Sequence, residues 1–239
     1  MKPLGLEGFR AACDVSRETM ARLERYAEML ETWSRAINLV GRVTVPDLWR
    51  RHMLDSAQLL ALLPPAPQGR RRLIDLGSGA GFPGLVLAIL GAGEVHLVEP
   101  DGKKAAFLRE VARTTDTEIE LHVCRIADLQ PFPVEVITAR ALAPLPKLLD
   151  LAAPFLCPGE TAEATEQTND RTNNRVNRTP NTSSANTPVG LFLKGREMER
   201  ELTDSAERWN MRLEVFPSRS DPGGRILRLS ELARKERRP

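Results

Sequence analysis

The glycines between Leu73 and Gly84 are the residues most clearly placed to do chemistry. A short apolar run, broken only by Asp75, leads into them without a gap, and a second apolar run follows them. This order is typical of a buried parallel strand, a tight turn and a buried helix. Glycines at such a junction let the backbone turn sharply and let a ligand approach the N-terminus of the helix.

The frame of these glycines distinguishes two classes of ligand. Gly79, Gly81 and Gly84 have the spacing of the dinucleotide fingerprint. In that fingerprint the first glycine follows the strand directly, whereas here Gly77 holds that position. A frame that begins at Gly77 suits S-adenosylmethionine better. Asp75 at the strand end adds support, since a carboxylate can bind the amino group of a methionine moiety and would repel a pyrophosphate.

A second acid extends the cofactor argument. The next predicted strand, 95–99, ends in Glu99, which lies 24 residues after Asp75. In nucleotide-binding α/β units an acidic residue about 20 residues beyond the glycine turn accepts hydrogen bonds from ribose hydroxyls. We therefore expect Glu99 to bind the ribose of the cofactor. The alternatives are a solvated acid at a strand end and a glycine turn that binds no ligand.

Length and composition set the outer bounds. The chain has 239 residues, of which 41% are apolar and 28% are charged, enough for one α/β domain with a smaller attachment. No apolar run approaches the roughly 20 residues of a membrane span, and the N-terminus has no apolar signal core. We expect no membrane association and a cytoplasmic location. The three cysteines are far apart, so neither a disulfide framework nor a metal site is expected.

Two helices are predicted before the glycine turn. Apolar residues at steps of three and four predict an amphipathic helix from Ser16, as its N-cap, to about Leu39. A second helix is predicted from Pro46 or Asp47 to Leu63, where a run of prolines ends it. We expect residues 1–69 to form a small N-terminal helical cap.

Basic residues accumulate in this part of the chain. Residues 1–72 contain twelve Lys or Arg and eight Asp or Glu, with clusters at Arg50–Arg51 and Arg70–Arg72. These clusters are close in sequence to the cofactor strand. A basic surface beside the site suits a phosphate-rich substrate.

The remaining pattern is that of an α/β domain over residues 70–239. Strands are predicted at 118–123, 134–138 and 189–195, helices at 101–113, 145–156 and 197–209, and a hairpin from strands 212–216 and 225–229. The expected fold is α/β, a seven-stranded Rossmann-like sheet with a terminal antiparallel hairpin. Residues 160–188 hold seven Thr and six Asn and little to bury, so they are predicted to be a disordered insertion in one loop.

Loops after two strands complete the expected site. Ligands in open α/β sheets bind outside the carboxyl ends of the strands. Ile126 and Ala127 follow the third strand, where this architecture receives the adenine, and Arg140 ends the fourth. We therefore expect Arg140 to point at the reaction site.

Six short motifs occur in the order found in one protein family. They are Asn38-Leu39, Arg51-His52-Met53-Leu54-Asp55-Ser56, the turn Asp75–Gly84, Lys103–Leu108, Ala139-Arg140-Ala141 and Leu193-Lys194-Gly195. Together they resemble the RsmG (GidB) family, within the class I S-adenosylmethionine-dependent methyltransferases. The resemblance covers roughly residues 20 to 230 apart from the insertion.

The resemblance implies a function and a set of contacts. The family methylates N7 of a guanosine in the decoding-region loop of 16S rRNA, so the implied partner is 16S rRNA of the small ribosomal subunit, bound by a monomer without a metal. Glu99 occupies the ribose position. The implied cofactor contacts are Gly77, Phe82, Ile126, Ala127 and Arg140.

Guanine N7 already carries an in-plane lone pair, so methyl transfer to it needs no general base. Alignment of the reacting atoms can supply roughly 7 to 11 kcal/mol. Consistent with this, the fourth strand is followed neither by the Asn/Asp-Pro-Pro-Tyr run of amino methyltransferases nor by a Pro-Cys. An NAD(P)-dependent oxidoreductase, a small-molecule methyltransferase and an RNA-binding protein without activity on the same fold are the alternatives.

Four side chains are candidates for the chemistry. Arg140 and Lys194 are expected to orient the guanine through O6 and the phosphates, or else to form salt bridges to Asp75 or Glu99. His52 and Asp55, three residues apart on one helix face, are candidates for a direct role, or for locking the cap onto the cofactor domain.

Overall fold

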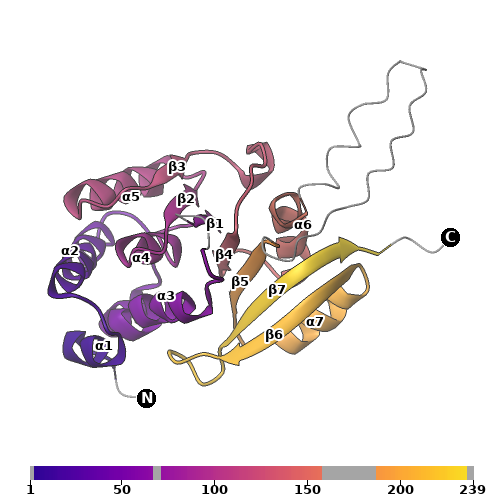
Figure 1. Cartoon of the computed structure of the whole chain (residues 1–239). Coiled ribbons are helices and arrows are strands. Elements are labelled where there is room, and N and C mark those ends of the chain that lie inside the picture. The colour runs from indigo at the N-terminus through magenta and orange to yellow at the C-terminus, as the bar shows by residue number, and fades with distance from the viewer. Residues whose placement is uncertain (1–2, 67–70, 158–186, 236–239) are drawn as a thin grey trace.

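A single mixed sheet forms the centre of the computed structural model, which describes residues 3–66, 71–157 and 187–235 (Figure 1). Its order is β3-β2-β1-β4-β5-β7-β6. β1 to β5 are parallel, and β7 is antiparallel to both β5 and β6. The strands are β1 (Arg72–Leu76), β2 (Glu94–Val98), β3 (Glu120–His122), β4 (Val136–Arg140), β5 (Val189–Lys194), β6 (Trp209–Pro217) and β7 (Arg225–Arg234).

This topology confirms the predicted sheet and its terminal hairpin. From β1 the chain runs outward through β2 and β3, and then crosses to β4 on the other side of β1. The order therefore reverses between β1 and β4, and ligands of doubly wound sheets bind at that point. The glycine turn follows β1, so the fold places this turn where the strand order reverses, at the expected ligand site.

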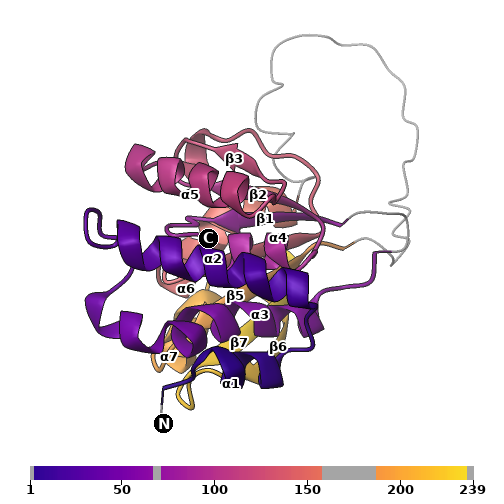
Figure 2. The same ribbon diagram turned by 90° about the vertical axis from the view of Figure 1, so that its left-hand side faces the viewer.

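Helices cover both faces of the sheet. α4 and α5 pack on one face with α1 to α3 outside them, and α6 and α7 pack on the other, as Figures 1 and 2 show. The helices are α1 (Leu6–Ala12), α2 (Arg17–Trp33), α3 (Asp55–Ala57), α4 (Gly84–Ile89), α5 (Gly102–Thr114), α6 (Leu145–Leu156) and α7 (Met198–Ala206). In the described parts of the chain, no helix is both long enough and apolar enough to cross a bilayer.

The N-terminal helices agree with the sequence in part. Ser16 caps α2 as predicted, because its Oγ accepts a hydrogen bond of 3.1 Å from the amide of Thr19. α2 ends at Trp33, earlier than predicted, and the short helix α1 was not predicted. The second predicted helix is a succession of short turns: η1 (Arg42–Asp47), η2 (Trp49–Leu54), α3 and η3 (Gln58–Leu62).

The helix η2 has π geometry, which inserts an extra residue into the turn and occurs often at functional sites. It carries His52, and Asp55 follows at once in α3. The irregular winding thus falls on the two residues of this segment that the sequence singled out.

One hydrophobic cluster joins the N-terminal helices to the sheet. Leu23 and Leu30 of α2 share it with Leu85 of α4 and Phe107 of α5. The division into residues 1–69 and 70–239 stays a prediction, since its boundary lies outside the described residues. The predicted insertion, 160–188, lies outside them almost entirely.

Tyr26 connects α2 to the glycine turn. Its buried hydroxyl donates to the carbonyl of Ala80, and its ring stacks on Phe82 with 5.3 Å between ring centroids. Replacing Tyr26 by Phe leaves the Ala80 carbonyl without this donor. We expect Tyr26→Phe to lower the free energy of unfolding by about 1 to 3 kcal/mol, measured by urea denaturation.

Thr115→Val is the matched control for this variant. Thr115 is also buried and donates to a main-chain carbonyl, that of Val111 at 2.8 Å, but at the end of α5. Both variants should lose stability, and only Tyr26→Phe should also weaken cofactor binding. Equal cofactor affinity in the two variants would show that Tyr26 does not support the turn.

Candidate active site

At one of the three glycines that follow β1, Gly79, a side chain would project into open space, and at the other two it would meet packed atoms. Gly77, Gly79 and Gly81 all have positive φ, at 69°, 58° and 98°, which an L side chain adopts only at a cost. A Cβ on Gly81 would meet the Tyr26 hydroxyl at 2.7 Å, and one on Gly77 would meet Leu142 at 2.6 Å. A Cβ on Gly79 would meet nothing closer than a carbonyl at 3.9 Å. Gly79 therefore faces open space, as the approach of a ligand to the backbone requires.

Glu99 lies directly against this turn. Its Oε2 accepts from the Gly79 amide at 2.8 Å, and its Oε1 accepts from the Asp101 amide at 2.9 Å. The residue is only 5% exposed, so it is not a solvated acid at a strand end. Each carboxylate oxygen can accept a second hydrogen bond, which leaves capacity for two hydroxyl groups of a sugar. The open glycine and this acceptor fit the nucleoside part of S-adenosylmethionine.

Asp75 is engaged inside the fold. Its Oδ1 accepts from the Thr138 hydroxyl at 2.7 Å, and its Oδ2 accepts from the Gly84 amide at 3.1 Å, at the start of α4. Complete burial raises its pKa to about 6, although these hydrogen bonds oppose the shift. The carboxylate therefore joins β1, β4 and α4, a structural role that the sequence did not indicate. Its contact with a methionine amino group stays a prediction.

Ile126 and Ala127 begin a short turn, η4 (Ile126–Asp128), after β3. Ile126 is half-buried against the core on the α6 side of the sheet, and Ala127 is exposed. η4 follows the carboxyl end of β3, at the edge of the sheet where the glycine turn follows β1. Their contact with adenine stays a prediction.

Arg140 is held by the N-terminal helices. Its Nη1 donates to the Arg51 carbonyl at 2.9 Å and lies 3.4 Å from Asp55 Oδ2, while its Nη2 donates to His52 Nδ1 at 2.9 Å. The guanidinium carbon lies 4.9 Å from the centroid of the Phe82 ring. Arg140 is thus fixed beside the glycine turn, at the end of β4, as the sequence predicted.

His52 and Asp55 meet at Arg140. The His52 ring stacks on Phe82, with 4.9 Å between centroids. Burial, with the charges of Arg140 and Arg51, lowers the His52 pKa to about 3. His52 is therefore neutral near pH 7, and a catalytic role for either residue stays a prediction.

Lys194 is bound on the other side of the site. Its Nζ lies 2.6 Å from Glu201 Oε2 and donates to the Ala143 carbonyl at 2.8 Å. Since Arg140 pairs with Asp55 and Lys194 with Glu201, the expected alternative of salt bridges to Asp75 or Glu99 is wrong. Glu201 was missed because it lies on α7, where the sequence shows only a charged helix.

A cleft of about 770 Å³ opens beside Arg140. Its walls come from segments far apart in the chain, at positions 39–44, 51–55, 140–144, 193–195 and 218–225. It holds Arg140, Lys194 and Arg225, and it adds Thr44 and Asp221, which the sequence did not single out. Leu142 connects the cleft to Gly77 of the turn. The volume is large enough for a nucleobase with its sugar.

Most of the predicted basic surface lies elsewhere. Arg71 and Arg72 stand at the start of β1, and the glycine turn follows the other end of that strand. Arg71 donates to the carbonyls of Pro64 and Ala92, and Arg72 pairs with Glu94 at 3.1 Å. Arg50 is buried and pairs with Asp47 at 3.3 Å.

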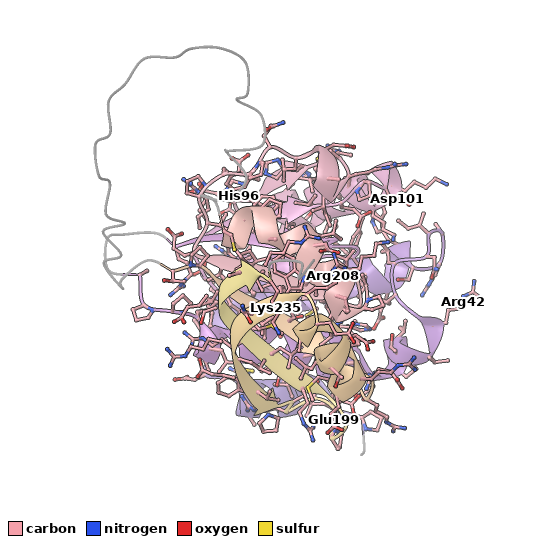
Figure 3. All side chains as sticks on the ribbon, turned by 90° about the vertical axis from the view of Figure 1, so that its right-hand side faces the viewer. Arg42, His96, Asp101, Glu199, Arg208 and Lys235 are labelled. Carbon is pink, nitrogen blue, oxygen red and sulfur yellow. The ribbon has the colours of Figure 1, made fainter. Side chains whose placement is uncertain are left out.

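The expectation that these arginines lie beside the site is therefore wrong for Arg50, Arg71 and Arg72, while Arg70 lies outside the described residues. Among the arginines of these two clusters that the structure describes, Arg51 is the one that lines the cleft. The face of α7 and the hairpin carries both signs of charge, as Glu199, Arg208 and Lys235 show in Figure 3. Over the residues that the structure describes, no group of three or more His, Cys, Asp or Glu is placed to hold a metal ion.

The fold is that of the methyltransferases that use S-adenosylmethionine. The solved structure of magnesium protoporphyrin IX methyltransferase from Synechocystis PCC 6803, with bound S-adenosylmethionine, is similar to this chain at a TM-score of 0.50. The similarity covers 90% of this chain and 97% of that one, at 13% sequence identity. At this identity the likeness defines the fold and leaves the substrate open.

Sequence comparison then defines the family. The family model for rRNA small subunit methyltransferase G matches residues 19–202. The ribosomal RNA small subunit methyltransferase G of Rhodospirillum rubrum is 53% identical over 95% of this chain and 98% of that protein. The protein of the same name from Paramagnetospirillum magneticum is 48% identical over 99% of this chain and all of that protein. The chain belongs to the rRNA small subunit methyltransferase G family, and it is an enzyme of the methyltransferase class.

The open position at Gly79 leads to a direct test. Gly79→Ala costs about 1 kcal/mol of backbone strain, because its φ is positive, and creates no clash in the protein. Its methyl group projects into the space where the cofactor is expected. We expect the variant to fold and to bind S-adenosylmethionine at least tenfold more weakly by calorimetry.

Gly91→Ala is the matched control. Gly91 has a φ of 76°, nothing within 4 Å of a Cβ, and a position after α4, away from the turn. It should lose similar stability and keep its cofactor affinity. The assignment of the turn fails if the Gly79 variant binds the cofactor as tightly as the Gly91 variant.

Proposed function

We propose that the chain transfers a methyl group from S-adenosylmethionine to N7 of a guanosine in 16S rRNA of the small ribosomal subunit. The observation that carries this proposal is the Arg140 guanidinium, fixed between the glycine turn and a cleft of nucleotide size. Family membership supports rRNA as the substrate. The resemblance of the motifs supports guanine N7 as the target.

S-adenosylmethionine, when bound, supplies an electrophilic methyl group. The open face of Gly79, the carboxylate of Glu99 and the main chain at Ile126 and Ala127 are the groups proposed to hold it. Phe82 lies between this site and the cleft, where it contacts both His52 and Arg140.

The chemistry of the cleft matches a nucleophile that needs no base. His52 is neutral, but its Nδ1 is occupied by Arg140 and its Nε2 by Thr44. Asp55 is bound to Arg140 and Gln58. None of these groups has to remove a proton when N7 of guanine accepts a methyl group, because the N7 lone pair is already available.

Arg140 is proposed to orient the base. A guanidinium has five N–H groups, and three of them account for its hydrogen bonds to Arg51, His52 and Asp55. The others can donate to guanine O6, which lies next to N7 on the same edge of the base. Correct alignment is the main contribution that such an enzyme makes.

Three arginines at the mouth of the cleft are proposed to bind the RNA backbone. Arg51 pairs with Asp221 at 3.1 Å, Arg225 lines the cleft, and Arg196 is exposed beside the hairpin turn at Gly223. Arginine binds phosphate oxygens through paired N–H groups. Lys194 is nearly buried against Glu201, so it contributes to the wall of the cleft more than to phosphate binding.

The proposal extends to assembly and location. We also propose that the enzyme acts as a monomer, as the resemblance of the motifs implies. An enzyme that modifies rRNA works where small subunits are made, in the cytoplasm. Family membership excludes the NAD(P)-dependent oxidoreductase.

Replacing Arg140 tests the proposed chemistry. Arg140→Ala removes the donor to the base and leaves His52 and Asp55 without their shared partner. We expect single-turnover methyl transfer to small subunits to fall at least about 100-fold, because misplacement of the reacting atoms is costly. Most of the RNA affinity should survive, with a change of less than about threefold.

Arg140→Lys is the companion variant, since it keeps the charge and loses the planar fork. It should recover little of the lost rate. Wild-type rates in Arg140→Ala would exclude Arg140 from the reaction, and a wild-type protein that never methylates small subunits would overturn the proposed function itself.

The salt dependence of RNA binding tests the arginine surface. Each phosphate that is neutralised contributes roughly 0.7 to 0.9 to the slope of log affinity against log salt. The double variant Arg196→Ser with Arg225→Ser should therefore flatten the slope by about 1.4 to 1.8, in filter binding to small-subunit RNA. Arg113→Ser, on α5 and paired with Glu110, is the control and should keep the slope. Identical slopes in all three proteins would move the RNA path away from the hairpin.

A further inference from the structure

We propose that Thr44 is a positioning residue for methyl transfer: its hydroxyl anchors the His52 ring through Nε2–H, and the anchored ring holds the Arg140 guanidinium through Nδ1. This inference rests on the proposed function, which places Arg140 against the substrate base. Thr44 lies in η1, on the wall of the cleft. It belongs to none of the sequence motifs that pointed to the family.

The direction of each hydrogen bond follows from the chemistry of the groups, starting at the outer end. Thr44 Oγ1 lies 2.7 Å from the carbonyl oxygen of Gly41, which can only accept. The single hydroxyl proton of Thr44 therefore points to Gly41. Toward His52 Nε2, at 2.8 Å, the hydroxyl oxygen must accept, so Nε2 carries a proton.

The inner end demands the same arrangement independently. Arg140 Nη2 lies 2.9 Å from His52 Nδ1, and a guanidinium can only donate. Nδ1 must therefore offer its lone pair. A neutral imidazole has one N–H and one lone pair, and the two neighbours of His52 require the same assignment of them.

The charged surroundings keep the ring in this state. His52 is 7% exposed, and the cations nearest to it are Arg140 on β4 and Arg51 on its own helix. Asp55 is the carboxylate of this cluster, and it binds Arg140, Gln58 and Ser220. Protonation of Nδ1 would set an N–H against the guanidinium. Burial and the two cations lower the His52 pKa to about 3, in agreement with a ring that is neutral near pH 7.

Loss of the Thr44 hydroxyl changes the balance. The Nε2–H group then has no acceptor from Thr44, so the ring loses its outer anchor and can turn. When the ring turns, Nδ1 leaves the guanidinium, and Arg140 loses one of its three hydrogen bonds. A wall of the cleft thereby controls the group that orients the base.

The test uses the full chain with ¹⁵N-labelled histidine and two variants, Thr44→Val and Thr44→Ser. Thr44→Val has nearly the same shape without the hydroxyl, and Thr44→Ser keeps the hydroxyl. The chain has only three histidines, so the ring signals of His52 are assigned by comparison with His52→Gln. The expected ¹⁵N shifts are those of an Nε2–H ring in all three proteins. The Nε2–H proton should exchange slowly with water in wild type and Thr44→Ser, and too fast to be observed in Thr44→Val.

Single-turnover methyl transfer to small subunits gives the second readout. Thr44→Val should slow the rate constant about tenfold with cofactor and RNA affinity within twofold of wild type, and Thr44→Ser should stay within threefold in rate. In an Arg140→Ala background Thr44→Val should have no further effect. The proposal is overturned if Thr44→Val keeps the slowly exchanging Nε2–H proton or the wild-type rate, or if Thr44→Ser is equally slow. A wild type that does not methylate small subunits overturns the proposed function instead, and the exchange of the Nε2–H proton still decides whether Thr44 anchors the ring.

Discussion

The guanidinium of Arg140 is the charge at which the cap helices, the sheet and the terminal hairpin meet. Asp55 binds Arg140 from β4 and also accepts from Ser220 in the hairpin loop. Taking a guanidinium out of water is expensive unless its partners are well placed, and removing one partner then costs more than the pair contributes. The arrangement of the three parts of the fold around the cleft therefore depends on this one group.

The cofactor turn is coupled to the same group through aromatic contacts. Phe82 lies within the turn and contacts the Arg140 guanidinium, the His52 ring and Tyr26. Tyr26 in turn donates to the main chain at Ala80. The methyl-donor side and the acceptor side thus share one rigid wall, which suits a reaction whose barrier is lowered by alignment rather than by proton transfer.

Much of this could be predicted from the sequence, because the signals are local. The glycine frame, the acid at Glu99 and the strand that ends at Arg140 depend on residues that are neighbours in the chain. The partners of Arg140 could not be predicted, since His52 and Asp55 lie 88 and 85 residues away from it in the chain and only the fold brings them together. The prediction that Arg71 and Arg72 lie beside the site was wrong, because nearness in sequence to β1 does not place a residue at the end of the strand where the site lies.

Nucleotide mapping of rRNA tests the central claim most directly. Small-subunit RNA from cells that lack this gene would be compared by mass spectrometry with RNA from the same cells complemented by the wild-type chain or by Arg140→Ala. We predict that 7-methylguanosine at one position of 16S rRNA disappears with the gene, returns with the wild-type chain and stays absent with the variant. Unchanged 7-methylguanosine in all three samples, or a methyl group restored at another atom or base, would contradict the proposed function.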